Sequence, residues 1–155
     1  MTEVALNKPG ILPPKGLLLA LGAQLPILAS SIPLRPSAGE LIAGVALLVA
    51  GITLNVWAER LFRVKNVGVC PFTPVPAVVA TGPYRFTRNP MYLGLVCVNL
   101  GATFLSGALA NIWSSVALFI WLHYAFVLPE ESFLRHELGH AFDVYAKRIP
   151  RWLFR

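Results

Sequence analysis

Charged residues are scarce in this 155-residue chain: Asp, Glu, Lys and Arg make up 13% of it, whereas hydrophobic residues make up 56%. This balance excludes an ordinary soluble domain, in which about a quarter of the residues are charged. Four runs contain no charged residue, and each is close to the roughly 17–25 residues that a bilayer-spanning helix needs. They cover residues 16–34, 41–58, 91–110 and 112–128. The sequence therefore predicts one all-α integral membrane domain over residues 1–155, with four transmembrane helices.

Acidic residues are also few: 7 Asp and Glu oppose 13 Lys and Arg, which gives a formal net charge of +6. Among these cations only Arg35 lies in a loop that the four-span topology places outside. Since positively charged loops stay in the cytoplasm, both termini and the polar segments are expected on the cytoplasmic side. The membrane is expected to be the inner membrane of a bacterium or archaeon. Topology and anionic lipid account for the charge, which is thus no argument for a nucleic-acid partner.

Residues that bind metals are scarce as well. The two cysteines, Cys70 in a polar loop and Cys97 inside a span, indicate neither a disulfide nor a Cys-x-x-Cys site. HELGH, residues 136–140, matches the H-E-x-x-H pattern of zinc peptidases. A catalytic zinc needs three protein ligands, however, and beyond His140 only Asp143 is of a suitable type. The sequence therefore argues against a zinc peptidase and predicts no metal site.

The segment around HELGH is expected to form a single amphipathic helix that lies against the ends of the spans and ends before Pro150. Its apolar face would consist of Leu134, Leu138, Phe142 and Tyr145. Its polar face would carry His136, His140, Asp143 and Lys147.

Small and polar residues inside the apolar runs predict how the helices pack. The pairs Gly44 and Gly51, and Gly94 and Gly101, are each seven residues apart, which is typical of a close helix-packing seam. Gly107 and Asn111 predict a tight turn that makes the last two spans a hairpin. Interhelical hydrogen bonds are expected from Gln24, Asn55 and Asn99.

The connector between the second and third spans is rich in proline. Residues 66–90 carry five prolines, which exclude a long helix. A connector of this length without secondary structure is uncommon in compact folds unless it has a use, and its Val, Phe and Tyr content is not that of a flexible linker. We therefore predict a functional loop that lies on the membrane face.

Two groups of residues are candidates for chemistry at the cytoplasmic rim. One is TGPYRFTRNPMYLG, residues 81–94, at the start of the third span, and the other is the acid pair Glu130 and Glu131 at the end of the fourth. Adjacent carboxylates at a helix end are unfavourable without a nearby cation, so they predict a cationic ligand or a paired arginine. His123, two helical turns before Glu130, is expected on nearly the same face, either in the site or hydrogen-bonded to a neighbouring helix.

These two groups resemble a known family. TPVPAVVATGPYRFTRNPMYLG, followed one helical hairpin later by EESFLRHELGHAFDVYAKRIPRW, is similar to the C-terminal core of the isoprenylcysteine carboxyl methyltransferase and phospholipid methyltransferase superfamily. The resemblance covers residues 73–152, about half of the chain, which would form the catalytic core. It implies an integral membrane methyltransferase that uses S-adenosylmethionine without a Rossmann domain, and the absence of G-x-G-x-x-G agrees with this.

The resemblance also implies which residues form the site. Glu130 and the tyrosine faces would accommodate the cationic part of the cofactor, and Arg88 or backbone amides would take its carboxylate, so Glu130 and Arg88 are the expected catalytic residues. The expected cofactor-binding residues are Pro76, Ala77, Val78, Val79, Tyr84, Asn89, Pro90, Met91, Tyr92, His123 and Glu130.

The methyl acceptor is less defined by the sequence. Isoprenylcysteine enzymes carry an arginine one turn before the acid that matches Glu130, where it is thought to hold the substrate's carboxylate; this chain has Phe126 there. A lipid amine, a small thiol or another lipophilic acceptor entering from the bilayer fits Phe126 better than a prenylcysteine carboxylate. The oligomeric state is left open. Two other hypotheses are a membrane reductase of the sterol reductase type that uses NADPH, and a non-enzymatic membrane scaffold.

Overall fold

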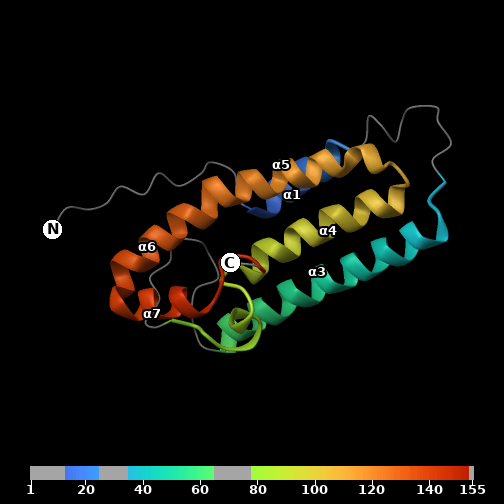
Figure 1. The fold of residues 1–155 in the computed structure, drawn as a ribbon. Coiled ribbons are helices and arrows are strands. Elements are labelled where there is room, and N and C mark those ends of the chain that lie inside the picture. Colours follow the sequence, from blue (N-terminus) through green and yellow to red (C-terminus); the bar gives the residue numbers. More distant parts are fainter. Residues whose placement is uncertain (1–12, 25–34, 65–77, 154–155) are drawn as a thin grey trace.

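The computed structural model describes residues 13–24, 35–64 and 78–153, and within them every regular element is a helix. The α-helices are α1 (Pro13–Gly22), α3 (Ala38–Val64), α4 (Pro90–Ser106), α5 (Ile112–Leu122), α6 (Leu128–Leu138) and α7 (His140–Arg148). Helix α4 lies along α3, and α1 packs against both α4 and α5 (Figure 1). The predicted all-α class is confirmed for this part of the chain.

Two helical segments among the described residues are long and apolar enough to cross a membrane. One is α3, with 27 residues, and the other is the continuous run Leu109–Leu138, with 30 residues. Helix α4 is apolar but has only 17 residues, or about 26 Å, slightly less than a bilayer core of about 30 Å. Residues 25–34 of the first predicted span lie outside the described residues. The second and fourth predicted spans are therefore helices, and the four-span topology stays a prediction.

The predicted turn between the last two apolar helices is confirmed, although α4 ends at Ser106 rather than at residue 110. Gly107 takes a left-handed conformation (φ 68°), and its N–H donates to the carbonyl of Phe104. A left-handed glycine is a common end of an α-helix because it lacks a Cβ. The short 3₁₀ helix η2 (Leu109–Asn111) then leads into α5.

The run from α5 to α6 contains a π-helical turn, η3 (His123–Val127), in which the N–H of Leu128 donates to the carbonyl of His123. Pro129 follows directly, and a proline inside an α-helix has no N–H and clashes with the carbonyl four residues earlier. The wider turn accommodates this residue, so the helix continues to Leu138. Glu130 and Glu131 therefore lie inside a long helix, and the prediction that they lie at a helix end is wrong.

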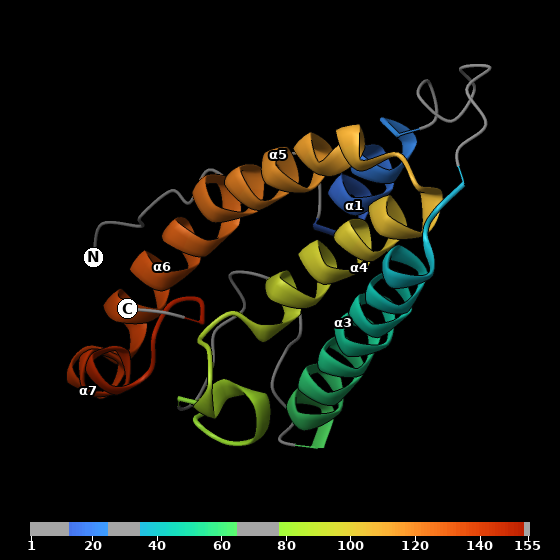
Figure 2. The same ribbon diagram turned by 45° about the vertical axis from the view of Figure 1, so that its right-hand side comes forward.

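The prediction of one C-terminal amphipathic helix is also wrong, because α6 and α7 are separate. Gly139, with φ 51° and ψ −125°, lies between them, in a region of backbone conformation that favours glycine. Helix α7 folds back sharply at the end of the bundle where α3 ends and α4 begins (Figure 2). It ends at Arg148, before Pro150, as predicted.

The glycine seam between α3 and α4 is confirmed. A Cβ atom added at Gly51 would lie 2.7 Å from the carbonyl oxygen of Gly94, and one added at Gly101 would lie 2.9 Å from that of Gly44. Two backbones come this close only where both helices carry small residues. The two contacts also show that α3 and α4 run in opposite directions.

A buried polar cluster joins α4, α5 and the residues that follow α1. The amide of Gln24 donates to Oδ1 of Asn99 (3.2 Å), and the amide of Asn99 donates to the hydroxyl of Ser115 (2.9 Å). These bonds confirm the predicted interhelical roles of Gln24 and Asn99. Asn55 instead donates to the carbonyl of Gly51 in its own helix (3.0 Å).

Candidate functional site

Two polar segments meet at one end of the bundle. One is residues 81–89, which lead into α4 and which we call the junction. The other is residues 150–152 after α7, which we call the C-terminal strap. The N–H of Arg88 donates to the carbonyl of Pro150 (3.0 Å). The hydroxyl of Thr87 and the side-chain amide of Asn89 both donate to the carbonyl of Arg151, at 3.0 and 2.9 Å. Both side chains are buried, so these bonds tie the strap firmly to the start of α4.

The local sequence explains the shape of the junction. Gly82 has a positive φ of 59°, and Pro83 lies in the first turn of the short helix η1 (Gly82–Arg85). Pro90 is the first residue of α4, where the missing N–H of proline costs nothing. The residues between η1 and α4 are consequently outside any helix, and their polar groups are available to bind the strap.

Glu131 is the buried anion around which the strap is held. Its two carboxylate oxygens accept hydrogen bonds from Nε and Nη2 of Arg151, at 3.0 and 2.8 Å. Nη1 of Arg88 lies 3.1 Å from the same carboxylate. The hydrogen bond to Glu131 raises the pKa of Arg151, whereas burial lowers the pKa of Arg88, a shift that Glu131 opposes. The paired arginine that the acid pair predicts is thus present twice.

Glu130 has a different partner from its neighbour. The hydroxyl of Tyr92, in the first turn of α4, donates to Oε2 of Glu130 (2.8 Å). Tyr92 is buried, and its ring centroid lies 6.1 Å from that of Phe126, which is also buried. The two sequence groups are therefore joined directly by a hydrogen bond between an acid and a tyrosine, beside a second aromatic ring.

Helix α7 covers the junction through two tyrosines. The hydroxyl of Tyr145 donates to the carbonyl of Tyr84 in η1 (2.9 Å). Burial raises the pKa of both phenols well above the usual value, so both stay neutral at physiological pH. This contact places α7 next to η1.

His123 lies in the π-helical turn and contacts the strap. Nε1 of Trp152 donates to Nδ1 of His123 (3.3 Å). An indole N–H can only donate, so Nδ1 accepts and a neutral His123 carries its proton on Nε2. His123 therefore makes a hydrogen bond to the strap rather than to a neighbouring helix, and its place in the site stays a prediction.

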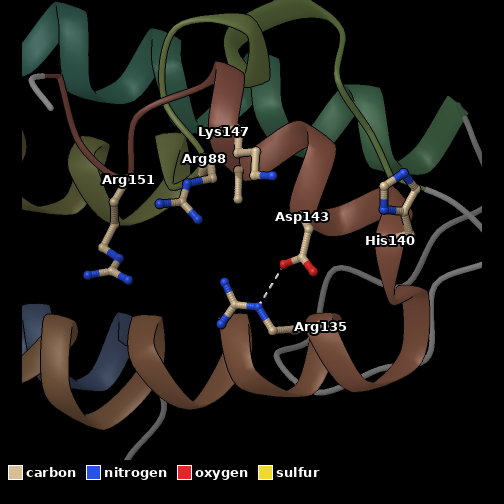
Figure 3. Close-up of a pocket in the computed structure, with 7 residues that line it drawn as sticks. Arg88, Arg135, His140, Asp143, Lys147 and Arg151 are labelled. Atoms are coloured by element: carbon tan, nitrogen blue, oxygen red, sulfur yellow. Dashed lines mark hydrogen bonds and ion pairs between the residues drawn. The ribbon is translucent and has the colours of Figure 1, made fainter.

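A pocket of about 490 Å³ opens beside the strap. It is lined by Arg88, Arg135, His140, Asp143, Ala146, Lys147 and Arg151. Figure 3 shows that α6, α7, the junction and the strap all contribute to it. Arg135 donates from Nε to Oδ1 of Asp143 (2.9 Å), and this ion pair links α6 to α7 across the pocket.

The structure gathers several of the predicted cofactor-binding residues. Tyr84, Asn89, Pro90, Met91, Tyr92 and Glu130 come from the junction, the start of α4 and α6. Val78 and Val79 are half-buried in the segment that leads to η1, whereas Pro76 and Ala77 lie outside the described residues. The side-chain amide of Asn89 is used to hold the strap.

Sequence reasoning missed the strap and the residues that hold it. Thr87, Arg151 and Trp152 were not singled out, and Tyr145 was expected only on the apolar face of a helix, although each makes a hydrogen bond between distant segments. One signal was present: an acid pair that calls for an arginine, in a chain whose last helix is followed by Ile-Pro-Arg-Trp.

The histidines of HELGH do not form a metal pair. His136 lies in α6 and His140 begins α7, with the turn at Gly139 between them, so they do not lie one turn apart on one helix. Both are exposed. Residues 13–24, 35–64 and 78–153 contain no group of three His, Cys, Asp or Glu side chains that could hold a metal ion.

In the part of the chain that the structure describes, two helical segments are long and apolar enough to cross a membrane, and a tyrosine–acid pair and a basic pocket lie at one end of the bundle. The model of the phospholipid methyltransferase family matches residues 40–141, about two thirds of the chain. The chain therefore belongs to the phospholipid methyltransferase family, as the resemblance to the wider superfamily implied, and is a membrane methyltransferase. Searches of curated proteins and of solved structures found no match.

Proposed function

We propose that this protein transfers a methyl group from S-adenosylmethionine to a lipophilic acceptor delivered by the membrane. The observation that carries the proposal is the 2.8 Å hydrogen bond between Tyr92 and Glu130. It joins the two sequence groups that carry the family resemblance, and Tyr92 and Glu130 themselves lie within the matched residues.

The residues around Glu130 are of a kind that fits this cofactor. A carboxylate beside the rings of Tyr92 and Phe126 can attract a cation through charge pairing and cation–π interaction. S-adenosylmethionine, when bound, supplies the methyl group. Glu130 and Tyr92 would then fix the orientation, and the aromatic side chains would exclude water, which are the main requirements of an in-line displacement.

Arg88 and Asn89 have structural partners that refine their roles. Arg88 pairs with Glu131, so we propose that it acts first as a positioning residue that fixes the helix carrying Glu130. That Arg88 binds a carboxylate of the cofactor stays a prediction. Asn89 would contribute by holding the strap next to the start of α4.

The acceptor that we favour is a membrane lipid with an amine. The family points to a membrane lipid, and the position at which the isoprenylcysteine enzymes carry an arginine is Phe126, whose ring packs edge-on against Trp121 at 5.1 Å. This apolar wall offers no cation to a prenylcysteine carboxylate. A small thiol is the second candidate. We place the site at the cytoplasmic face of an inner membrane, on the distribution of basic residues.

Cofactor binding by the detergent-purified full chain tests the proposal. Equilibrium dialysis with labelled S-adenosylmethionine and, in parallel, with NADPH separates a methyltransferase from a membrane reductase. We expect saturable binding of S-adenosylmethionine alone. Binding of NADPH alone would favour the reductase, and binding of neither by folded protein would favour the scaffold. Incubation of labelled cofactor with a lipid amine and with a small thiol then identifies the acceptor class.

A further inference from the structure

The pocket beside the strap lies next to the surroundings of Glu130 and shares Arg88 with the residues predicted to bind the cofactor. Its lining includes neither Tyr92 nor Glu130, and its volume of about 490 Å³ lies within the range of about 300–1,000 Å³ that is typical of small-molecule sites. It lies where α6, α7, the junction and the strap meet (Figure 3).

The walls of this pocket are strongly basic. Four cationic side chains line it, from Arg88, Arg135, Lys147 and Arg151, against one carboxylate, that of Asp143. Glu131 pairs with Arg88 and Arg151. When its negative charge is included, the surroundings of the pocket still carry a surplus of positive charge. A cavity with this surplus of positive charge concentrates anions.

The arginines are held in place before any ligand arrives. Arg88 and Arg151 are fixed by Glu131, and Arg135 is fixed by Asp143 and lies 5.6 Å above the ring of Phe142. Among the described residues, Nε of Arg88 is buried without a hydrogen-bond partner. Figure 3 shows Arg88 and Arg135 on opposite sides of the pocket, with Asp143 and His140 toward one end and Arg151 toward the other.

We propose that this pocket binds a phosphate group. Guanidinium groups that approach from several sides match an anion with several acceptor oxygens, and arginine forms paired hydrogen bonds with phosphate. Asp143 repels an anion, so the group lies toward Arg151. The phosphate belongs either to a lipid headgroup, which the rim of the bundle can reach, or to a soluble ligand. This inference rests on the pocket alone and does not require the proposed cofactor.

Two substitutions that break the same ion pair should change the phosphate affinity of the pocket in opposite directions. Arg135→Gln and Asp143→Asn each remove the contact between α6 and α7, but the first removes a cation from the pocket and the second removes an anion. Calorimetric titration of the detergent-purified full chain with inorganic phosphate, at constant ionic strength, should show affinity about tenfold lower for Arg135→Gln. For Asp143→Asn it should be severalfold higher. The exposed Arg60→Gln on α3 is the matched control and should leave the affinity unchanged.

A second arm identifies the source of the phosphate. Mixed micelles that contain phosphatidic acid, or diacylglycerol with the same chains as a control, are added to phosphate-loaded protein. Displacement by phosphatidic acid alone assigns the site to a lipid headgroup, and no displacement by either assigns it to a soluble phosphate ligand. The proposal is overturned if wild-type protein shows no saturable phosphate binding, if both pocket substitutions change affinity in the same direction, or if S-adenosylmethionine competes for the pocket. Failure to bind S-adenosylmethionine would affect only the proposed function.

Discussion

Arg151 and Glu131, 20 residues apart in the chain, form a two-point ion pair with N–O distances of 3.0 and 2.8 Å. The carboxylate of Glu131 is buried and also lies 3.1 Å from Arg88. Glu131 therefore binds three segments together: the first turn of α6, the junction before α4 and the strap.

Arg151→Ala should destabilise the protein by about 1.5–3 kcal/mol, the range for hydrogen bonds to a charged group, because the buried Glu131 would lose both hydrogen bonds from Arg151. The stability of Arg151→Lys should lie between those of the wild type and Arg151→Ala, since a lysine makes one contact where the arginine makes two. Thermal unfolding in detergent measures both, with the exposed Arg60→Ala as control. Equal unfolding temperatures for Arg151→Ala and Arg60→Ala would show that the pair does not hold the strap.

Glu130→Gln should weaken S-adenosylmethionine binding about 10- to 100-fold, because it keeps the shape of the side chain but removes the charge that attracts a cation. Tyr92→Phe should weaken binding less, by loss of the hydrogen bond that orients Glu130. Equilibrium dialysis gives the dissociation constants. Glu137→Gln, at an exposed position of the same helix, is the control. Wild-type affinity in Glu130→Gln would contradict the assigned role.

Gly51→Ala should destabilise the bundle by about 1–3 kcal/mol, because the new Cβ would lie 2.7 Å from the carbonyl oxygen of Gly94 and force α3 and α4 apart. Gly39→Ala is a control on the same helix: the nearest atom to its Cβ is 4.0 Å away. The control should be neutral or slightly stabilising, since alanine favours helix. Unfolding temperatures in detergent compare the stability of Gly51→Ala with that of Gly39→Ala. Similar values for the two variants would argue against the seam.

Gly139→Ala should cost about 1–2 kcal/mol through backbone strain alone, because Gly139 has a positive φ and no atom lies within 4 Å of an added Cβ. The substitution also favours joining α6 and α7 into one helix, which would draw Tyr145 away from Tyr84. We therefore expect both a lower unfolding temperature and weaker cofactor binding. An unchanged variant would mean that the turn is set by contacts of α7 rather than by glycine.

The sequence alone predicted the apolar helices and the residues that pack them. The two glycine pairs, Gln24 and Asn99 could be identified because spacing within one helix and polarity inside an apolar run are local properties. The acid pair and the segment that contains Tyr92 were identified from their residues, and the family resemblance supplied the roles expected of them. In each case the signal lies in one or two short segments.

The parts that were predicted wrongly depend on geometry that spacing does not contain. A repeat of Leu134, Leu138, Phe142 and Tyr145 at helical intervals predicted one helix, but the positive φ at Gly139 divides it. The strap was missed because the residues that bind it, among them Thr87, Asn89 and His123, are far away in the chain. Contacts of that kind follow from the fold and leave no periodic pattern.

The π-helical turn before Pro129 absorbs one residue without changing the rotational position of the helix that follows. A turn of this kind holds one residue more than an α-helical turn. Deleting one residue between His123 and Val127 would therefore allow a regular α-helix, and the helix beyond would keep nearly the same orientation. Glu130, Glu131 and Arg135 would still face Tyr92, Arg151 and Asp143. Chains that differ here by one residue would carry the same side chains on the same side of the helix, so their motifs correspond in space although counting along the chain places them one residue apart.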